Sequence, residues 1–188
     1  MNIVFCHGVM DPEQDWNART YNPTKGWKYW LQFMAETEHD VIMQIPQFPH
    51  GHALLMKYDE WAAIMDRQDI GEDTVLIGHS AGGGFVLKYL AMHPDLRIRQ
   101  AVLVAPWIDV ENFQPFGFYQ GMRISNDLVA QAKEGIDLMI SDDDDSYILG
   151  SADKIMKDAP KVRLHRFAGR GHFLSPTLPG LLQIIKFE

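Results

Sequence analysis

The sequence predicts an α/β protein whose mostly parallel sheet has about six strands and is flanked by helices on both faces. Short runs rich in Val and Ile are typical of strands that are buried on both faces. Amphipathic segments lie between these runs, which indicates βαβ units joined by right-handed crossovers. The length of 188 residues fits one domain, so we expect residues 1–188 to form a single unit with a minimal lid.

Six short apolar runs are the expected strands. They are residues 3–6, 41–45, 74–77, 101–105, 137–140 and 162–167. Arg163, His165 and Arg166 interrupt the last run, so we expect that strand at an edge of the sheet.

Apolar stripes with helical spacing predict the helices. Trp27, Trp30, Leu31 and Met34 follow the i, i+3, i+4, i+7 pattern, with Thr24 as a candidate cap. The expected helices are residues 27–34, 54–65, 85–92, 126–133, 152–157 and 178–185.

The composition excludes several classes of protein. Apolar residues make up 46% of the chain and charged residues 22%, which allows a packed core and excludes disorder. The net charge of −8 argues against nucleic acid or an anionic membrane as the partner. One cysteine, Cys6, excludes an intramolecular disulfide and a cysteine-based zinc cluster, and it fits a reducing cytosol. No apolar run reaches the roughly 18 residues of a membrane span, and residues 2–6 are too short for a signal-peptide core, so we expect a cytoplasmic protein.

A Gly-x-Ser-x-Gly motif carries the strongest functional signal. It runs from Gly78 to Gly82, after an expected strand and before an expected helix, with Ser80 in the middle. This context is that of a nucleophile elbow, in which a tight, strained turn exposes the serine hydroxyl above the sheet. The Ala81 N–H, at the start of the helix, would then face a developing oxyanion. The alternative is an ordinary glycine-rich turn with an exposed serine.

A serine nucleophile needs a base and an acid that orients the base. His172 is the candidate base, because it lies on a glycine-rich loop after the last expected strand. The acid should follow a strand between Ser80 and His172, and the strand at 137–140 leads into four aspartates at 142–145. A solvated loop is the alternative for most of this cluster. A calcium loop is disfavoured, because Tyr147 stands where that loop needs a glycine.

The loop after the first expected strand is the expected source of a second oxyanion donor. Gly8 allows a close approach there, so the N–H of Val9 or Met10 could point at the site. Cys6 and His7 are interpreted as structural residues.

Two other groups of residues allow a functional and a structural interpretation. The segment 107–122 either supplies an aromatic wall for an apolar substrate group or covers the core; its candidates are Phe113, Phe116, Phe118 and Tyr119. The pair His50 and His52 could bind a metal, but without carboxylate partners a plain loop is the favoured interpretation.

With these motifs the chain resembles the α/β-hydrolase superfamily. More narrowly, it resembles the small serine hydrolases grouped with retinoblastoma-binding protein nine and its short bacterial relatives. The resemblance covers nearly the whole chain and includes the Gly8 turn, Gly26-Trp27, residues 77–82, 101–104, 144–145 and 164–173. It implies the α/β-hydrolase fold and hydrolysis of an ester, thioester or amide, with no metal or organic cofactor. The family name also records protein binding.

The family's site residues can be carried over onto matching positions. The resemblance implies Ser80 as nucleophile, His172 as base and Asp145, the second residue of an Asp-Asp pair, as the acid. This sequence departs from the family pattern there, because Leu149 replaces the usual proline and two extra aspartates precede the pair. Asp144 is therefore the second choice for the acid.

We therefore expect a serine hydrolase that cleaves a small-molecule carboxylic ester, thioester or amide through an acyl-enzyme on Ser80. One alternative is a catalytically idle protein of the same fold that binds a protein partner. Another is a different chemistry on this fold, such as that of a lyase or a cofactor-free haloperoxidase, because fold alone does not fix the reaction.

Overall fold

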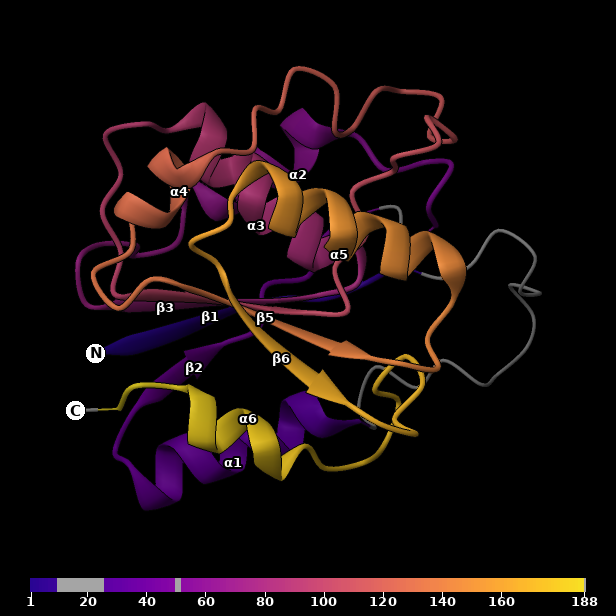
Figure 1. Ribbon diagram of the computed structural model, residues 1–188. Coiled ribbons are helices and arrows are strands. Elements are labelled where there is room, and N and C mark those ends of the chain that lie inside the picture. Colours follow the sequence, from indigo (N-terminus) through magenta and orange to yellow (C-terminus); the bar gives the residue numbers. More distant parts are fainter. Residues whose placement is uncertain (10–25, 50–51, 188) are drawn as a thin grey trace.

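The computed structural model describes residues 1–9, 26–49 and 52–187 and confirms the α/β architecture (Figure 1). All strand pairs of its six-stranded sheet are parallel, and the strand order is β2-β1-β3-β4-β5-β6. The strands are β1 (Asn2–Cys6), β2 (Ile42–Gln44), β3 (Thr74–His79), β4 (Gln100–Val104), β5 (Ile136–Ser141) and β6 (Arg163–Phe167). All six expected strands are confirmed, and β6 lies at an edge as predicted.

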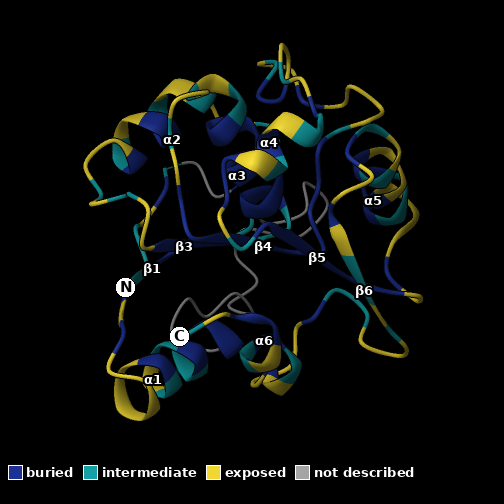
Figure 2. Ribbon diagram, turned by 60° about the vertical axis from the view of Figure 1, so that its left-hand side comes forward, coloured by how far each residue is buried: buried dark blue, intermediate teal, exposed yellow. Residues whose placement is uncertain are grey.

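The helices form one layer on each face of the sheet. Helices α1 and α6 cover one face, and α2 to α5 cover the other (Figure 1). Their bounds are α1 (Trp27–Glu38), α2 (Tyr58–Met65), α3 (Ala81–Met92), α4 (Asn126–Ala130), α5 (Ser146–Asp158) and α6 (Pro179–Ile184). Buried residues line the sheet side of the outer helices and exposed residues line their outer side, whereas α3 is buried along almost its whole length (Figure 2).

Helix α5 is the largest departure from the expected elements. It begins at Ser146 rather than at residue 152 and runs for 13 residues. Ile148, Ala152 and Ile155 are almost fully buried and lie at i, i+4 and i+7, so an apolar stripe was present in the sequence. Gly150 interrupts this stripe, which makes the first half of the helix hard to recognise. The expected cap Thr24 lies outside the described residues, and Gly26 occupies the N-cap position of α1.

The core lies between the central strands and the two helix layers. Strands β1, β3 and β4 are almost entirely buried, as expected for parallel strands covered on both faces. Cys6 is fully buried at the end of β1, with its Sγ 3.8 Å from Sδ of Met65, and burial raises the pKa of its thiol far above the ordinary value. Within the described part of the chain, no helix has the length and apolar character needed to cross a bilayer.

The carboxyl ends of the strands meet at one edge of the sheet. Cys6 pairs with Gly78, His79 with Val104, and Ser141 with Phe167, so the loops that follow these strands emerge side by side. Ligands bind at this edge in open α/β sheets. The segments that carry the candidate site residues therefore lie at the same edge.

Candidate active site

Ser80 occupies a strained turn between β3 and α3. Its φ of 55° and ψ of −123° are unfavourable for a residue with a side chain, at a cost of about 1–3 kcal/mol. Four backbone hydrogen bonds stabilise this conformation. The Ser80 N–H donates to the Val104 carbonyl at 2.9 Å, and its carbonyl accepts from the N–H groups of Gly83 (2.9 Å), Gly84 (3.3 Å) and Trp107 (3.0 Å). The turn predicted from the motif is therefore present.

The glycines of the motif are required by close backbone packing. A Cβ on Gly78 would lie 2.4 Å from the Gly82 carbonyl oxygen, and a Cβ on Gly82 would lie 2.1 Å from the Cys6 carbonyl oxygen. Both distances are far below van der Waals contact. Only glycine at both positions lets α3 start directly against β1 and β3.

The loop after β1 lies against Ser80. A Cβ on Gly8 would be 3.0 Å from Cβ and 3.6 Å from Oγ of Ser80. His7 anchors this loop, because its Nε2 accepts from the Phe48 N–H at 3.1 Å and its Nδ1 therefore carries the ring proton and donates to the Gly8 carbonyl at 2.8 Å. Burial lowers the pKa of His7, so the neutral ring is favoured. Val9 is partly buried next to this peptide, and Met10, the other candidate donor, lies outside the described residues.

His172 is held by Asp144 and not by Asp145. Its Nδ1 lies 3.0 and 3.1 Å from the two carboxylate oxygens of Asp144, whose side chain is 1% exposed. The expectation that Asp145 contacts His172 is wrong. Asp145 occupies the N-cap position of α5, and its Oδ2 instead accepts a hydrogen bond from the Tyr147 hydroxyl at 3.1 Å. After the turn that ends β5, these two neighbouring aspartates have different partners, and their order in the sequence could not show which of them binds His172.

His79 connects the elbow to the loop that carries His172. Its Nε2 donates to the His172 carbonyl at 2.9 Å, and the two rings lie 4.9 Å apart. Burial, together with the adjacent His172 ring, lowers the pKa of His79 to about 3, so this ring stays neutral at physiological pH. Both residues lie within the described ranges, and no hydrogen bond joins the Ser80 hydroxyl to His172. Such contacts are often long before a substrate binds.

The four aromatic candidates for a substrate wall do not form one surface. Phe118 is fully buried, with its ring 5.1 Å from that of Trp61, and Tyr119 donates its hydroxyl to the Ala81 carbonyl at 3.0 Å. Phe113 and Phe116 are more than half exposed. The prediction that Phe118 lines a substrate wall is therefore wrong, because this ring belongs to the core. Tyr119 instead supports the first turn of α3.

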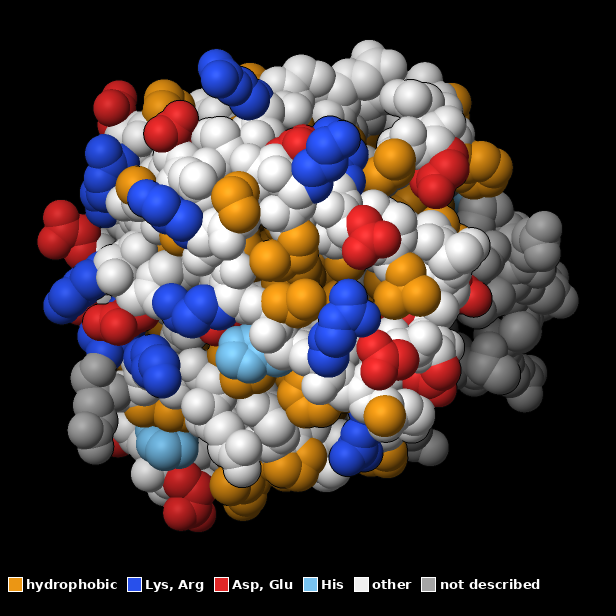
Figure 3. All heavy atoms as spheres, in the orientation of Figure 1, with side chains coloured by type: hydrophobic (Ala, Val, Ile, Leu, Met, Phe, Trp, Pro, Cys, Tyr) orange, Lys and Arg blue, Asp and Glu red, His pale blue; other side chains and the backbone are white. Residues whose placement is uncertain are grey.

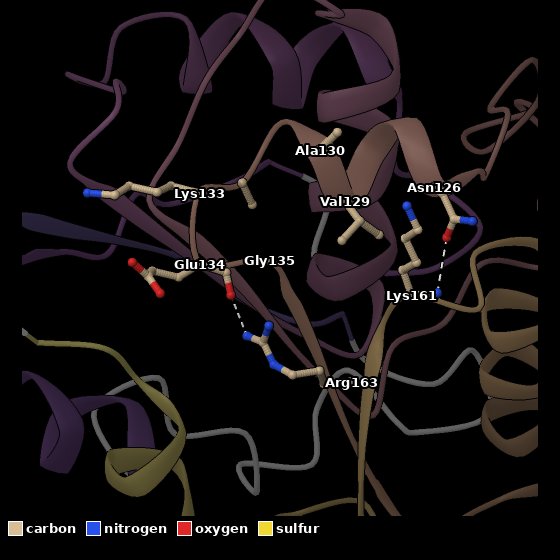
Figure 4. A pocket seen from close by; sticks show the side chains of 9 residues that line it. Asn126, Val129, Ala130, Lys133, Glu134, Gly135, Lys161 and Arg163 are labelled. Atoms are coloured by element: carbon tan, nitrogen blue, oxygen red, sulfur yellow. Dashed lines mark hydrogen bonds between the residues drawn. The ribbon is translucent and has the colours of Figure 1, made fainter.

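Two hollows of the described structure lie away from Ser80 and do not coincide with the predicted site. One, of about 360 Å³, is lined by Asn126, Val129, Ala130, Ala132, Lys133, Glu134, Gly135, Lys161 and Arg163 (Figure 4). Gly135 precedes β5 and Arg163 begins β6, so this hollow lies at the amino ends of the strands, opposite Ser80. The other, of about 250 Å³, includes Tyr119 and residues of α5.

The described residues do not bring together three side chains of the kinds that bind metals. His52 lies in a turn, where its Nδ1 accepts from the Leu54 N–H at 3.2 Å. Its expected partner, His50, lies outside the described ranges.

Structural similarity to solved α/β proteins extends over 97% of the chain in each of three cases. The ydeN gene product of Bacillus subtilis superposes with a TM-score of 0.73 at 21% identity, over 95% of that chain. Est1E of Butyrivibrio proteoclasticus with ferulic acid bound gives 0.63 at 16% identity, over 85% of that chain. Naproxen esterase of B. subtilis gives 0.58 at 14% identity, over 81% of that chain. At these identities the similarity establishes the fold alone.

The sequence comparisons also bear on the family to which the chain belongs. A curated relative, the non-heme haloperoxidase of Rhodococcus erythropolis, is 29% identical over 109 residues, which are 54% of this chain. The chain spans only 35% of that relative's length. The family model described as serine aminopeptidase, S33, matches residues 47–171, which include Ser80 and Asp144 and end one residue before His172. The narrower resemblance to retinoblastoma-binding protein nine stays a prediction, whereas the broader one is confirmed: the chain belongs to the α/β-hydrolase family of serine aminopeptidase S33.

Proposed function

We propose that this protein is a serine hydrolase that cleaves an ester, thioester or amide of a small molecule through an acyl-enzyme on Ser80. The observation that carries the proposal is a strained serine elbow whose neighbour His79 binds the backbone of His172, a partly exposed imidazole that is paired with the buried carboxylate of Asp144. Ser80 follows His79, and His79 binds the carbonyl of His172, whose ring binds Asp144. A hydroxyl, an imidazole and a carboxylate in this order are the components of nucleophilic acyl transfer.

The proposed mechanism follows from the tautomer of His172. A carboxylate only accepts hydrogen bonds, so the ring proton lies on Nδ1 beside Asp144, and Nε2 keeps its lone pair. Nε2 takes the Ser80 proton as Oγ attacks the substrate carbonyl carbon, and it returns that proton to the leaving group when the acyl-enzyme forms. A water molecule then attacks the acyl-enzyme with the same base, which releases the acid and restores Ser80.

The tetrahedral oxyanion is assigned two backbone donors. Ala81 is the first residue of α3, so its N–H has no acceptor within the helix. Val9 is the second donor, because the His7 ring fixes the Gly8 carbonyl and thereby the orientation of the Gly8–Val9 peptide beside Ser80. Loss of one such donor reduces kcat by roughly 10²–10³.

A fluorophosphonate probe tests the nucleophile. We expect the wild-type protein to be labelled at Ser80, and we expect labelling to be lost in Ser80→Ala and strongly slowed in His172→Ala. A panel of p-nitrophenyl esters of increasing acyl length then tests turnover and maps the acyl preference. A folded wild-type chain that is neither labelled nor active would overturn the proposal and leave the alternative of a protein-interaction module.

Paired substitutions test the acid. Asp144→Asn should lower kcat by up to about 10⁴, because the amide no longer stabilises the imidazolium or fixes its tautomer. Asp145→Asn is the matched control and should retain most activity, since its carboxylate faces Tyr147. Equal losses in the two variants would contradict the assignment of Asp144.

A second candidate function is haloperoxidation, favoured by the match to the non-heme haloperoxidase. The same acyl-enzyme would be attacked by hydrogen peroxide instead of water, which would release a peracid and regenerate Ser80. The peracid would then oxidise a halide. Bromination of a diketone in acetate and peroxide, lost in Ser80→Ala, would support this activity.

We also propose that residues 1–188 act as one domain in the cytoplasm. The basis is the length of the chain and its single cysteine. Expression of the tagged protein followed by cell fractionation would test the location.

A further inference from the structure

The loop that carries His172 is fastened to the end of β5 by two consecutive backbone hydrogen bonds. The Arg170 N–H donates to Oγ of Ser141 at 2.9 Å, and the Gly171 N–H donates to Oδ1 of Asp143 at 3.0 Å. The Ser141 hydroxyl in turn donates to the same Oδ1 at 2.5 Å. These three contacts form a closed network directly before His172, which we call the 141–143 clamp.

The His172 loop needs such a clamp because its own backbone is permissive. Gly169 and Gly171 have φ values of 67° and 48°, in the left-handed region that glycine adopts readily. A loop with this composition gains little rigidity from its own chain. Its order must come from contacts with neighbouring elements, and Ser141 is a fixed anchor because it is fully buried at the end of β5.

The four aspartates at 142–145 have four different partners. Asp142 pairs with Arg166 at the surface, Asp144 binds the His172 ring, and Asp145 binds Tyr147. Asp143 alone accepts a backbone N–H of the His172 loop. Hydrogen bonds from Ser141 and Gly171 lower the pKa of Asp143, so its carboxylate stays ionised at neutral pH.

We propose that Ser141 and Asp143 are positioning residues that hold the general base of the reaction in its working orientation. The inference rests on the proposed function and adds residues that do not touch the reacting atoms. Asp144 fixes the ring of His172, whereas the clamp fixes the backbone from which that ring extends. A displacement of about 1 Å in a catalytic group can reduce the rate by about 10².

Steady-state kinetics with a p-nitrophenyl ester test the clamp. Asp143→Ala and Ser141→Ala should each lower kcat by roughly ten- to a hundredfold with little change in KM, because the base is misplaced while the substrate pocket is intact. The kcat of the double variant should equal that of the slower single variant, because both residues act through one network and their effects do not add. Asp143→Asn should recover most of the rate, since an amide oxygen can accept the same two hydrogen bonds.

Asp142→Ala is the matched control, because it removes the same charge one position earlier from a residue that pairs only with exposed Arg166. It should leave kcat near the wild-type value. Amide exchange of the peptide spanning 168–174 should be faster in Asp143→Ala than in Asp142→Ala. Equal kcat values in these two variants, or an Asp143→Asn variant as slow as Asp143→Ala, would overturn the proposal.

Failure of the clamp and failure of the hydrolase proposal are distinguishable. A wild-type protein that shows neither turnover nor fluorophosphonate labelling would overturn the hydrolase function itself. Wild-type turnover together with unchanged kcat and unchanged exchange in Asp143→Ala would overturn the clamp alone.

Discussion

His79 combines two properties that follow from its place in the elbow. Its side chain packs against Trp27, with ring centroids 5.6 Å apart, and its Nε2 holds the His172 carbonyl. Protonation of the ring would place a charge in a partly buried site beside a second imidazole. Burial and the neighbouring ring therefore lower the pKa of His79 to about 3.

This lowered pKa predicts how stability depends on pH. The unfolded chain binds a proton at residue 79 below about pH 6.5, whereas the folded chain does so only near pH 3, so His79 makes stability fall as pH falls between these values. The slope due to one such group is at most about 1.4 kcal/mol per pH unit. His79→Gln should therefore show a shallower loss of stability from pH 6.5 towards pH 4 in urea titrations. An unchanged slope would contradict the lowered pKa.

At the scale of single residues, the sequence predicted types of side chain better than individual positions. Ser80 and His172 could be chosen because each is defined by a local motif. The carboxylate partner of His172 could not, because Asp144 and Asp145 differ only in which way the chain turns after β5. Phe118 and Phe113 could not be separated either, because burial of an aromatic ring in a long loop depends on what that loop packs against.

At the scale of elements, helix α3 and helix α5 use glycine in opposite ways. Gly82 in α3 lies where a Cβ would overlap the Cys6 carbonyl oxygen, at 2.1 Å. A Cβ on Gly150 in α5 would meet only Oε1 of Glu111 outside the backbone of its own helix, at an ordinary contact distance of 3.9 Å. The same residue type is thus required in one helix and replaceable in the other.

Alanine substitutions test this contrast. Gly82→Ala should destabilise the fold by more than about 2 kcal/mol, because α3 must move away from β1. Gly150→Ala should stabilise it by up to about 1 kcal/mol, because alanine is the better helix former and meets no clash. Urea denaturation of both variants measures these changes. Wild-type stability in Gly82→Ala would contradict the close packing.

The strands could be predicted more fully than the helices. Parallel strands buried on both faces are continuous apolar runs, and the strand ends shifted by only one or two residues. The sequence predicts only the second half of helix α5. Its three buried apolar residues lie at i, i+4 and i+7, and this helical signal is weakened by Gly150 and by two serines in the first half of the helix. The 141–143 clamp could not be predicted from the sequence, because a serine at the end of a strand followed by aspartates is compatible with many loop conformations.

At the scale of the whole molecule, the buried carboxylate of Asp137 links the edge strand β6 to residues 184–186, near the end of the described part of the chain. Asp137, 2% exposed on β5, accepts hydrogen bonds from Arg163 at 2.9 Å and 2.6 Å and lies 2.8 Å from Nε2 of His165. Gln100 donates to Asp137 and to the Ile184 carbonyl, and it accepts from the Lys186 N–H. Burial alone would raise the pKa of Asp137, but hydrogen bonds from these partners outweigh burial and lower it.

Asp137→Ala should therefore destabilise the protein by roughly 2–4 kcal/mol at pH 7, because it leaves Arg163 and the Gln100 amide without their shared partner. The lowered pKa means that this contribution is present above about pH 4 and is lost as the pH falls below that value. The difference from wild type should shrink in acid. Asp142→Ala, which removes an exposed pair, should cost less than about 1 kcal/mol. Thermal or urea unfolding at pH 7 and pH 3 measures both variants.

One face of the molecule carries charged side chains of both signs. On the face seen in Figure 3, lysine and arginine side chains alternate with aspartate and glutamate, and apolar side chains are interspersed among them. No broad field of one charge is visible on that face.

The buried thiol of Cys6 also makes the chain suitable for spectroscopy. It is the sole cysteine in the sequence, and its thiol is buried and protonated. Maleimide dyes should therefore not react with it while the protein is folded. A cysteine introduced at Leu174, 76% exposed and two residues past His172, would then carry one fluorophore next to the His172 loop. Slow modification of Cys6 in the native protein would in turn report how often the whole molecule opens.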